Sequence, residues 1–161
     1  MGLDLTAYKS VELEELEFVE PVSETERGAL LRSSLLRLRQ SYGFGARSDG
    51  LLDGYYRTGA SRSRRVGSCG GYSWWRDALC QRVHGCTVDA FRARSSDEGA
   101  FGELISFSDC DGFIGPKTCT KLHADFVAHT NIGEDAELGW RFKAIGALFA
   151  FAADGGVVDF H

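Results

Sequence analysis

The spacing of the apolar residues changes along this chain, and that change limits the folds open to it. Residues 3–15 alternate imperfectly between apolar and polar side chains, which is typical of a half-buried strand followed, after Ser10, by a second strand or an extended arm. The last third of the chain has apolar residues three or four positions apart, as in a helix with one buried face. Strands that precede helices without regular alternation favour an α+β fold.

Glycine, proline and serine place the remaining elements that we expect. Residues 29–39 fit either a helix or a strand, and a glycine-rich loop over residues 43–54 follows them. Tyr55 and Tyr56 begin a short strand, Ser73 caps a helix over residues 74–83, and residues 100–107 alternate as a strand. Pro116 begins a helix after a tight loop, residues 136–153 form a longer helix, and residues 157–160 return as a strand. The predicted fold is one α+β domain, residues 1–161, with a small, mainly antiparallel sheet and about three helices packed on one face.

The composition fits a soluble globular protein. Of 161 residues, 43% are hydrophobic and 25% are charged. No apolar run reaches the roughly 18 residues that a membrane span requires. The five cysteines are an odd number, they lack metal-ligand spacing, and no secretory signal precedes them. We therefore expect reduced thiols in a cytoplasm, no membrane association, no metal and no cofactor.

Charge is segregated along the sequence. Residues 1–26 have a balance of −7, residues 27–94 a balance of +9, and residues 95–161 again −7. Thirteen of the fourteen arginines lie in the middle segment, which has no lysine. Because the planar guanidinium matches phosphate and carboxylate groups, this bias indicates anion recognition. The alternative is that the arginines pair with the acidic ends of the chain and leave a mixed surface.

The densest basic run is RTGASRSRR, residues 57–65. Its glycine and serine content predicts a loop, and Arg57, Arg64 and Arg65 are candidate ligands for an anion. The alternative is a solvated loop without a partner.

The segment Ser106–Gly115 is a second candidate. We expect it to link a strand to a helix, so that the helix N-terminus could meet an anion. Ser108 could donate a hydrogen bond, Asp109 and Asp111 could accept one from a base or a ribose, and Gly112 would permit close approach. Equally, Asp109 could cap the turn and nothing would bind. A calcium loop is disfavoured because Thr120 stands where a bidentate glutamate is needed.

A third candidate is Gly70–Arg76. Tyr72 and Trp74 could stack a base, and Arg76 could hold a phosphate. The alternative places both tryptophans in the core, with Arg76 reaching a nearby acid.

Several segments resemble a family of small, uncharacterised proteins of tailed phages and prophages. They are GLDLTAY (2–8), YSWWRDAL (72–79), FGELISFSDCDGFIGP (101–116), KLHADF (121–126) and FAADGGVVDFH (151–161). RTGASRSRR is more basic than the family pattern, and GSCGGYS has an extra cysteine. The resemblance implies a phage accessory protein of the host cytoplasm, and by analogy an anti-defence role, but it supplies no reaction.

Three functions remain open. The first is binding of a small anionic ligand, a nucleotide, without turnover. The second is inhibition of a host defence protein through the acidic segments 12–26 and 134–137. The third is hydrolysis of a phosphoester or glycosidic bond with Asp109 or Asp111 as acid, base or metal ligand. Direct DNA binding ranks last because no recognition helix is visible, and a homodimer stays open.

Overall fold

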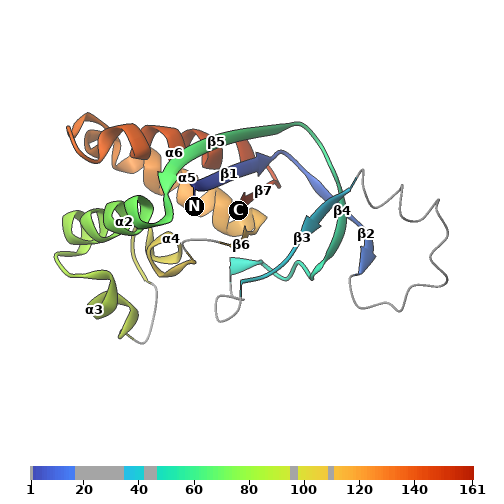
Figure 1. Cartoon of the computed structure of the whole chain (residues 1–161), viewed down its shortest axis with the longest axis horizontal. Helices are drawn as coiled ribbons and strands as arrows, with labels where there is room; N and C mark the ends of the chain where they lie inside the picture. The colour runs from blue at the N-terminus through green and yellow to red at the C-terminus, as the bar shows by residue number, and fades with distance from the viewer. Residues whose placement is uncertain (1, 17–34, 42–46, 95–97, 109–110) are drawn as a thin grey trace.

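Two antiparallel sheets and a set of helices make up a computed structural model that describes residues 2–16, 35–41, 47–94, 98–108 and 111–161 (Figure 1). The larger sheet has the strand order β5–β1–β7–β6 and the smaller one β2–β4–β3. The strands are β1 (Gly2–Tyr8), β2 (Val11–Leu16), β3 (Leu36–Leu38), β4 (Gly54–Thr58), β5 (Ser61–Ser68), β6 (Gly112–Ile114) and β7 (Val157–Phe160). The helices are α2 (Cys69–His84), α3 (Val88–Arg92), α4 (Gly102–Ser106), α5 (Pro116–Ala128), the 3₁₀ helix η2 (Thr130–Glu134) and α6 (Gly139–Ala152). The predicted α+β class is confirmed.

A long two-stranded ribbon joins the two sheets. β1 pairs with β5 in the larger sheet, and β2 pairs with β4 in the smaller one. Between them, Lys9 N–H donates to the Ala60 carbonyl and Gly59 N–H to the Ser10 carbonyl, at 3.0 and 3.1 Å. The prediction of a loop over residues 57–65 is therefore wrong. Backbone pairing with β1 holds most of this segment as a strand, and its polar composition reflects side chains that are exposed.

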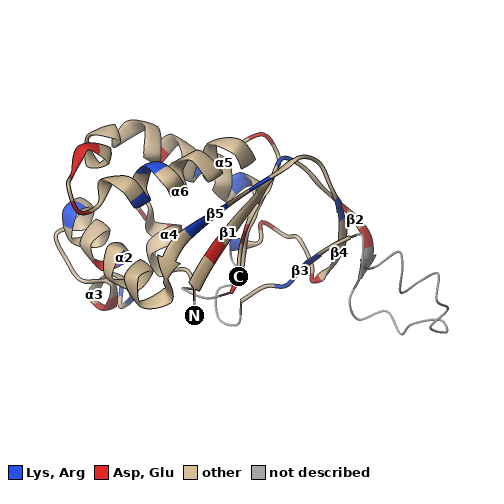
Figure 2. Ribbon diagram, turned by 45° about the horizontal axis from the view of Figure 1, so that its top comes forward, with Lys and Arg blue, Asp and Glu red and all other residues tan. Residues whose placement is uncertain are grey.

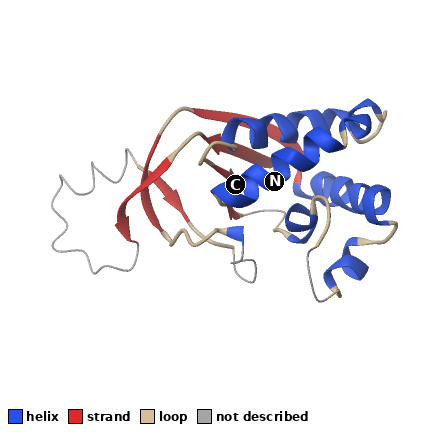
Figure 3. Cartoon of the chain, turned by 180° about the vertical axis from the view of Figure 1, so that it is seen from behind, coloured by secondary structure: helices blue, strands red, loops and turns tan. Residues whose placement is uncertain are grey.

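The helices cover one face of the larger sheet. Leu3, Leu5 and Ala7 of β1 point toward them and are fully buried with Val158 and Phe160 of β7. Figure 3 shows the helices gathered on one side while the strands of the smaller sheet extend away from them. The expectation of helices on one face is confirmed, and the short helices α3 and α4 add to the three that the sequence predicts.

A second, smaller apolar cluster covers part of the opposite face. It joins Leu38 and Tyr56 of the smaller sheet to Phe113 of β6 and Val157 of β7. The Tyr56 hydroxyl donates to the Leu52 carbonyl at 2.7 Å, which satisfies its polar end. The rest of this opposite face is polar and forms the site described below.

The segment over residues 100–107 is helical, contrary to the predicted strand. Phe101 adopts a left-handed φ of 60°, and its N–H donates to Asp125 Oδ2 at 2.7 Å. α4 follows it, and Leu104 and Ile105 are buried along with Phe101 and Phe107. The segment is buried on nearly every side. The alternation of its apolar and polar residues therefore does not distinguish a buried face from a solvent-exposed one.

Helix α2 begins five residues earlier than predicted. Ser68, not Ser73, is the N-cap, and its Oγ accepts from Gly71 N–H at 3.0 Å. Arg141 packs against this turn so closely that a Cβ on Gly71 would lie 2.8 Å from Arg141 Nη2. The helix ends at His84, one residue beyond the predicted end, and Gly85 caps it with a left-handed φ of 67°.

The predicted boundaries of the remaining elements agree more closely with the structure. Pro116 is the first residue of α5, and β7 spans residues 157–160 as expected. Helix α6 begins at Gly139, after Asp135 Oδ1 accepts from the N–H groups of Glu137 and Leu138. The tight loop before Pro116 contains the short strand β6. Residues 36–38 adopt the strand alternative, and residues 29–34 lie outside the described residues.

Candidate functional site

The face of the larger sheet that turns away from the helices carries polar side chains in register. Successive residues of a strand point to opposite faces. Because Leu3, Leu5 and Ala7 face the helices, Asp4, Thr6 and Tyr8 face the other way.

Neighbouring strands add polar residues to the same face. Thr6 is paired with Ser63 of β5 and with Asp159 of β7, and Asp4 is paired with Arg65. His161 continues β7, because Asp4 and His161 exchange backbone hydrogen bonds of 2.8 and 2.9 Å. We call this surface the polar face; it comprises Asp4, Thr6, Tyr8, Ser63, Arg65, Asp159 and His161.

Thr6 is the centre of a hydrogen-bonded row. Its Oγ1 lies 2.9 Å from Ser63 Oγ and 2.9 Å from His161 Nε2. Thr6 is only 5% exposed, whereas Ser63 and His161 are exposed. A buried hydroxyl thus fixes two side chains that can offer further hydrogen bonds to a molecule in solvent.

Asp159 is a poorly solvated acid of this face. Burial raises the pKa of its carboxyl to about 7, and the Phe160 N–H offsets only part of this shift. Burial also raises the pKa of Tyr8, and the nearby Asp159 charge adds to that effect. Phe113, which is paired with Asp159, is an apolar neighbour that gives no compensating hydrogen bond. Near neutral pH this carboxyl can therefore donate a proton or accept one.

Arg65 supplies positive charge at the start of β1. Its guanidinium lies against Gly2, where any Cβ would overlap it. It is exposed, and it forms no ion pair with a residue that the structure describes. The charge is therefore presented to solvent on the polar face, where Asp4 of β1 stands between Arg65 and His161.

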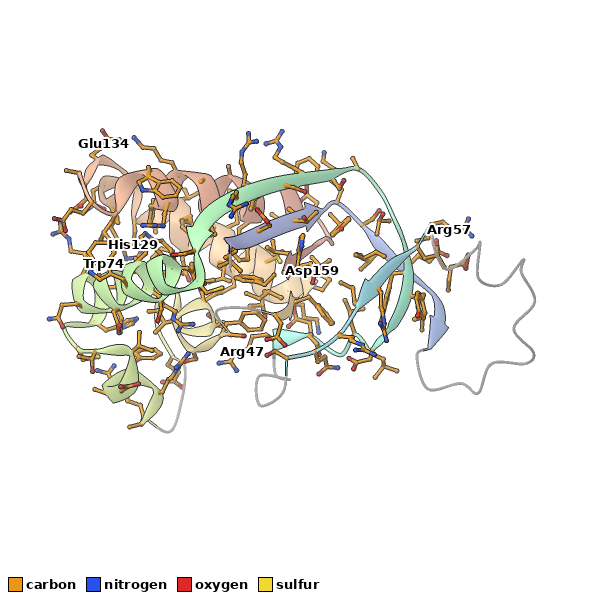
Figure 4. All side chains as sticks on the ribbon, in the orientation of Figure 1. Arg47, Arg57, Trp74, His129, Glu134 and Asp159 are labelled. Carbon is orange, nitrogen blue, oxygen red and sulfur yellow. The ribbon has the colours of Figure 1, made fainter. Side chains whose placement is uncertain are left out.

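The other two predicted arginines of the basic run lie elsewhere. Arg64 is paired with Leu5, so it projects from the helix side of β5, opposite to Arg65. Arg57 belongs to β4 and forms an ion pair with Glu14 of β2. Figure 2 shows basic residues spaced along β5 and β4 rather than gathered at one place, and Figure 4 places Arg57 at the far end of the ribbon from Trp74.

The predicted aromatic wall is divided between core and surface. Tyr72 is fully buried, with its ring centroid 5.7 Å from that of Trp75. Trp74 is 49% exposed, and it lines a surface cavity of about 400 Å³ between α2 and α3. Arg76 is 4% exposed and donates to the Phe107 carbonyl, so its role is to fasten α2 to the end of α4.

The predicted loop residues hold their own turn together. Ser108 Oγ donates to Asp111 Oδ1 at 2.8 Å, and Ser41 Oγ donates to the same oxygen at 3.1 Å. Gly112 has φ 94° and packs so tightly that a Cβ would lie 2.6 Å from that of Ser41. Asp109 lies outside the described residues. Because Gly112 is paired with Phe160, Asp111 sits at the level of His161, at the same end of the sheet as Arg65.

The N-terminus of α5 already holds an anionic group of the protein. Asp49 Oδ2 accepts from Thr118 N–H at 2.8 Å, and Asp49 Oδ1 accepts from the Thr118 hydroxyl at 3.0 Å. The carboxylate comes from a loop about 70 residues earlier in the chain and takes the place of a capping side chain. An external anion would have to displace it.

Three described acids of the two terminal segments have local roles. Glu14 pairs with Arg57, Glu134 pairs with Lys143 at 2.9 Å, and Asp135 caps the turn before α6. Residues 17–26 lie outside the described residues.

The polar face is not among the sites that the sequence predicts. Its signal in the sequence was present: Asp4, Thr6 and Tyr8 alternate with apolar residues in a predicted strand, and Asp159 and His161 do so in another. The missing knowledge was that the two strands are neighbours and that Arg65 lies in a third strand beside them.

Comparisons of the chain with protein-family models, with curated proteins and with solved structures gave no match. In the described part of the chain, no three histidine, cysteine or acidic side chains are grouped closely enough to hold a metal. None of the described helices has the length and apolar character needed to cross a bilayer.

Proposed function

We propose that this protein binds a small anionic ligand, a nucleotide, on the polar face and releases it unchanged. Its biological role would be that of a phage accessory protein that sequesters a nucleotide signal of a host defence system in the host cytoplasm. The first part rests on the geometry of the sheet, and the second on the resemblance of the sequence to small phage proteins.

The observation that carries the proposal is that Ser63 and His161, both held by the buried Thr6, lie on the same face as Arg65. A guanidinium, a hydroxyl group and an imidazole together can donate hydrogen bonds to phosphate oxygens. Asp159 can accept from a ribose hydroxyl or a base when ionised and can donate to an oxyanion when protonated. Tyr8 lies on the same face of β1, four residues after Asp4. At about 3.3 Å per residue, the two residues are about 13 Å apart. This length is comparable to that of a nucleoside phosphate.

The experiment is a search for a bound ligand by two independent routes. Native mass spectrometry of protein purified from cells that carry an active defence system should show an added mass, and denaturation should release an intact nucleotide. A thermal-shift panel of nucleoside phosphates, cyclic nucleotides, cyclic dinucleotides and inorganic phosphate should raise the melting temperature for a subset. An apo mass together with no shift across the panel at near-saturating concentration would reject the proposal.

The polar face also favours a second function, phosphoester hydrolysis, because Asp159 carries a pKa of about 7 beside His161. A carboxyl with such a pKa is suited to general acid or base catalysis. In this alternative, the same mass-spectrometric experiment releases a cleaved nucleotide. Asp159→Asn would then abolish turnover while leaving the protein folded.

A further inference from the structure

Two thiols meet where α2 ends. The left-handed conformation of Gly85 lets its N–H donate to the Gln81 carbonyl at 3.0 Å and turns the chain back over the helix. Cys86 is consequently placed beside Cys80, with 4.0 Å between the two sulfur atoms. Cys80 is buried and Cys86 is half-buried, so solvent reaches the pair from the Cys86 side.

A cation lies against the outer sulfur. Arg94 Nη2 is 3.2 Å from Cys86 Sγ, and the guanidinium is also 5.2 Å from the centre of the Phe91 ring. Arg94 thus presents positive charge to the sulfur that would be negative when it attacks an electrophile. Burial and the adjacent Cys86 raise the pKa of the inner thiol, Cys80.

We propose that Cys80 and Cys86 form a peroxide-sensitive dithiol that closes to an intramolecular disulfide. In the first step, the Cys86 thiolate attacks one oxygen of hydrogen peroxide, the O–O bond breaks, and hydroxide leaves to be protonated to water. This step oxidises Cys86 to a sulfenic acid. In the second step, Cys80 attacks the sulfenic sulfur, the S–O bond breaks, and a second water leaves with the Cys80 proton. The dithiol loses two electrons, and one peroxide is reduced to two waters.

The geometry permits this closure with little movement. A disulfide needs its sulfurs about 2 Å apart, so from 4.0 Å the two must approach by about 2 Å. Cys86 is followed directly by Thr87, the N-cap of α3, and Asp77 of α2 accepts from Val88 N–H at 3.2 Å. The bond would therefore fasten α3 to α2 beside the cavity that Trp74 lines.

Other cysteines provide internal controls. Cys69 is half-buried at the start of α2, and Cys119 is buried, with its thiol donating to the Ile114 carbonyl at 3.3 Å. Arg82 lies between Cys80 and Cys86, so trypsin separates them into the peptides DALCQR and VHGCTVDAFR. A Cys80–Cys86 disulfide is thus detectable as one linked pair of peptides.

The test is peptide mapping of the reduced protein after exposure to hydrogen peroxide and then to an alkylating reagent. We expect the linked peptides DALCQR and VHGCTVDAFR, a mass decrease of two hydrogens in the intact protein, and reversal by dithiothreitol. Cys86→Ser should abolish the link, Arg94→Gln should slow its formation several-fold, and Cys69→Ser should change neither.

Opposite outcomes would overturn the proposal. Recovery of both peptides separately alkylated after peroxide treatment is one such result, and a Cys86 sulfinic acid without the link is another. A disulfide between molecules as the main product also contradicts it. If Cys86→Ser fails to fold, Cys80→Ala provides a second test. In this variant, peroxide should oxidise Cys86 without forming the link between the two peptides.

Discussion

Thr6 Oγ1 lies 2.9 Å from His161 Nε2, which joins a side chain of the first strand to the residue that follows the last one. The contact exists because β1 and β7 are antiparallel neighbours in the middle of the larger sheet. It brings residues from distant parts of the sequence onto one polar face. The following predictions test the fold around this face and then the face itself.

Asp159 should make stability depend on pH. Its folded pKa of about 7 lies above its ordinary value of 3.8. The folded state therefore holds a proton over a range in which the unfolded chain has lost it. This contribution to stability is complete below about pH 4, falls as pH rises toward 7, and is gone above the folded pKa. Asp159→Asn should flatten this decline and raise the free energy of unfolding at pH 8 by about 1–3 kcal/mol.

Urea titrations of the wild type and of Asp159→Asn at pH 5, 6, 7 and 8 measure the effect. The two proteins should converge toward the acidic end of the series. A wild-type stability that rises between pH 5 and pH 7 while the variant stays level would contradict the assignment of this pKa.

Gly156 should not tolerate a side chain. A Cβ there would overlap the carbonyl oxygen of Tyr8, and backbone atoms cannot move aside cheaply. We expect Gly156→Ala to lower the free energy of unfolding by about 2–3 kcal/mol. Gly70 is the matched control, because it lies in the first turn of α2 and a Cβ added to it would have nothing within 4 Å. Gly70→Ala should be neutral or mildly stabilising. Equal chemical-denaturation midpoints for the two variants would count against the described packing.

Asp49 should stabilise α5, although it lies far from that helix in the sequence. Asp49→Ala removes both of its bonds to Thr118 and should cost about 1–2 kcal/mol in the free energy of unfolding. Asp49→Asn keeps an acceptor and should recover part of the loss. Asp154→Ala, at an exposed position, should change stability by less than about 0.5 kcal/mol. If Asp49→Ala is as stable as Asp154→Ala by calorimetry, this carboxylate does not cap the helix.

Local signals in the sequence were enough to predict much of the fold. Pro116 marks the start of α5 because a proline has no N–H to leave unsatisfied, and Gly85 marks the end of α2 because glycine adopts a left-handed φ without strain. The strand expected over residues 100–107 is wrong because Phe101 and Leu104 are both buried, which removes the contrast between two faces. Ser68 is not recognisable as a cap from the sequence, because the glycines that follow it are typical of a turn.

The site was less predictable because it depends on pairing between distant strands. Arg64 and Arg65 are adjacent in sequence and looked equivalent, yet strand geometry sends them to opposite faces. Tyr72 looked available for stacking, but the packing of α2 on the sheet buries it against Phe160. Arg65 is a predicted residue that lies on the polar face, and the places of Thr6 and Asp159 on that face follow only from the register of β1.

If the polar face binds a small anion, loss of the Arg65 side chain should weaken binding, and loss of the adjacent Arg64 side chain should not. Arg65→Ala and Arg64→Ala remove the same charge one residue apart, from opposite faces of β5. Isothermal titration calorimetry would use the nucleotide that gives the largest thermal shift with the wild type. We predict that Arg65→Ala weakens binding at least tenfold, about 1.4 kcal/mol, while Arg64→Ala leaves the dissociation constant within about twofold. Equal weakening by both variants, or weakening by Arg64→Ala alone, would contradict binding at the polar face.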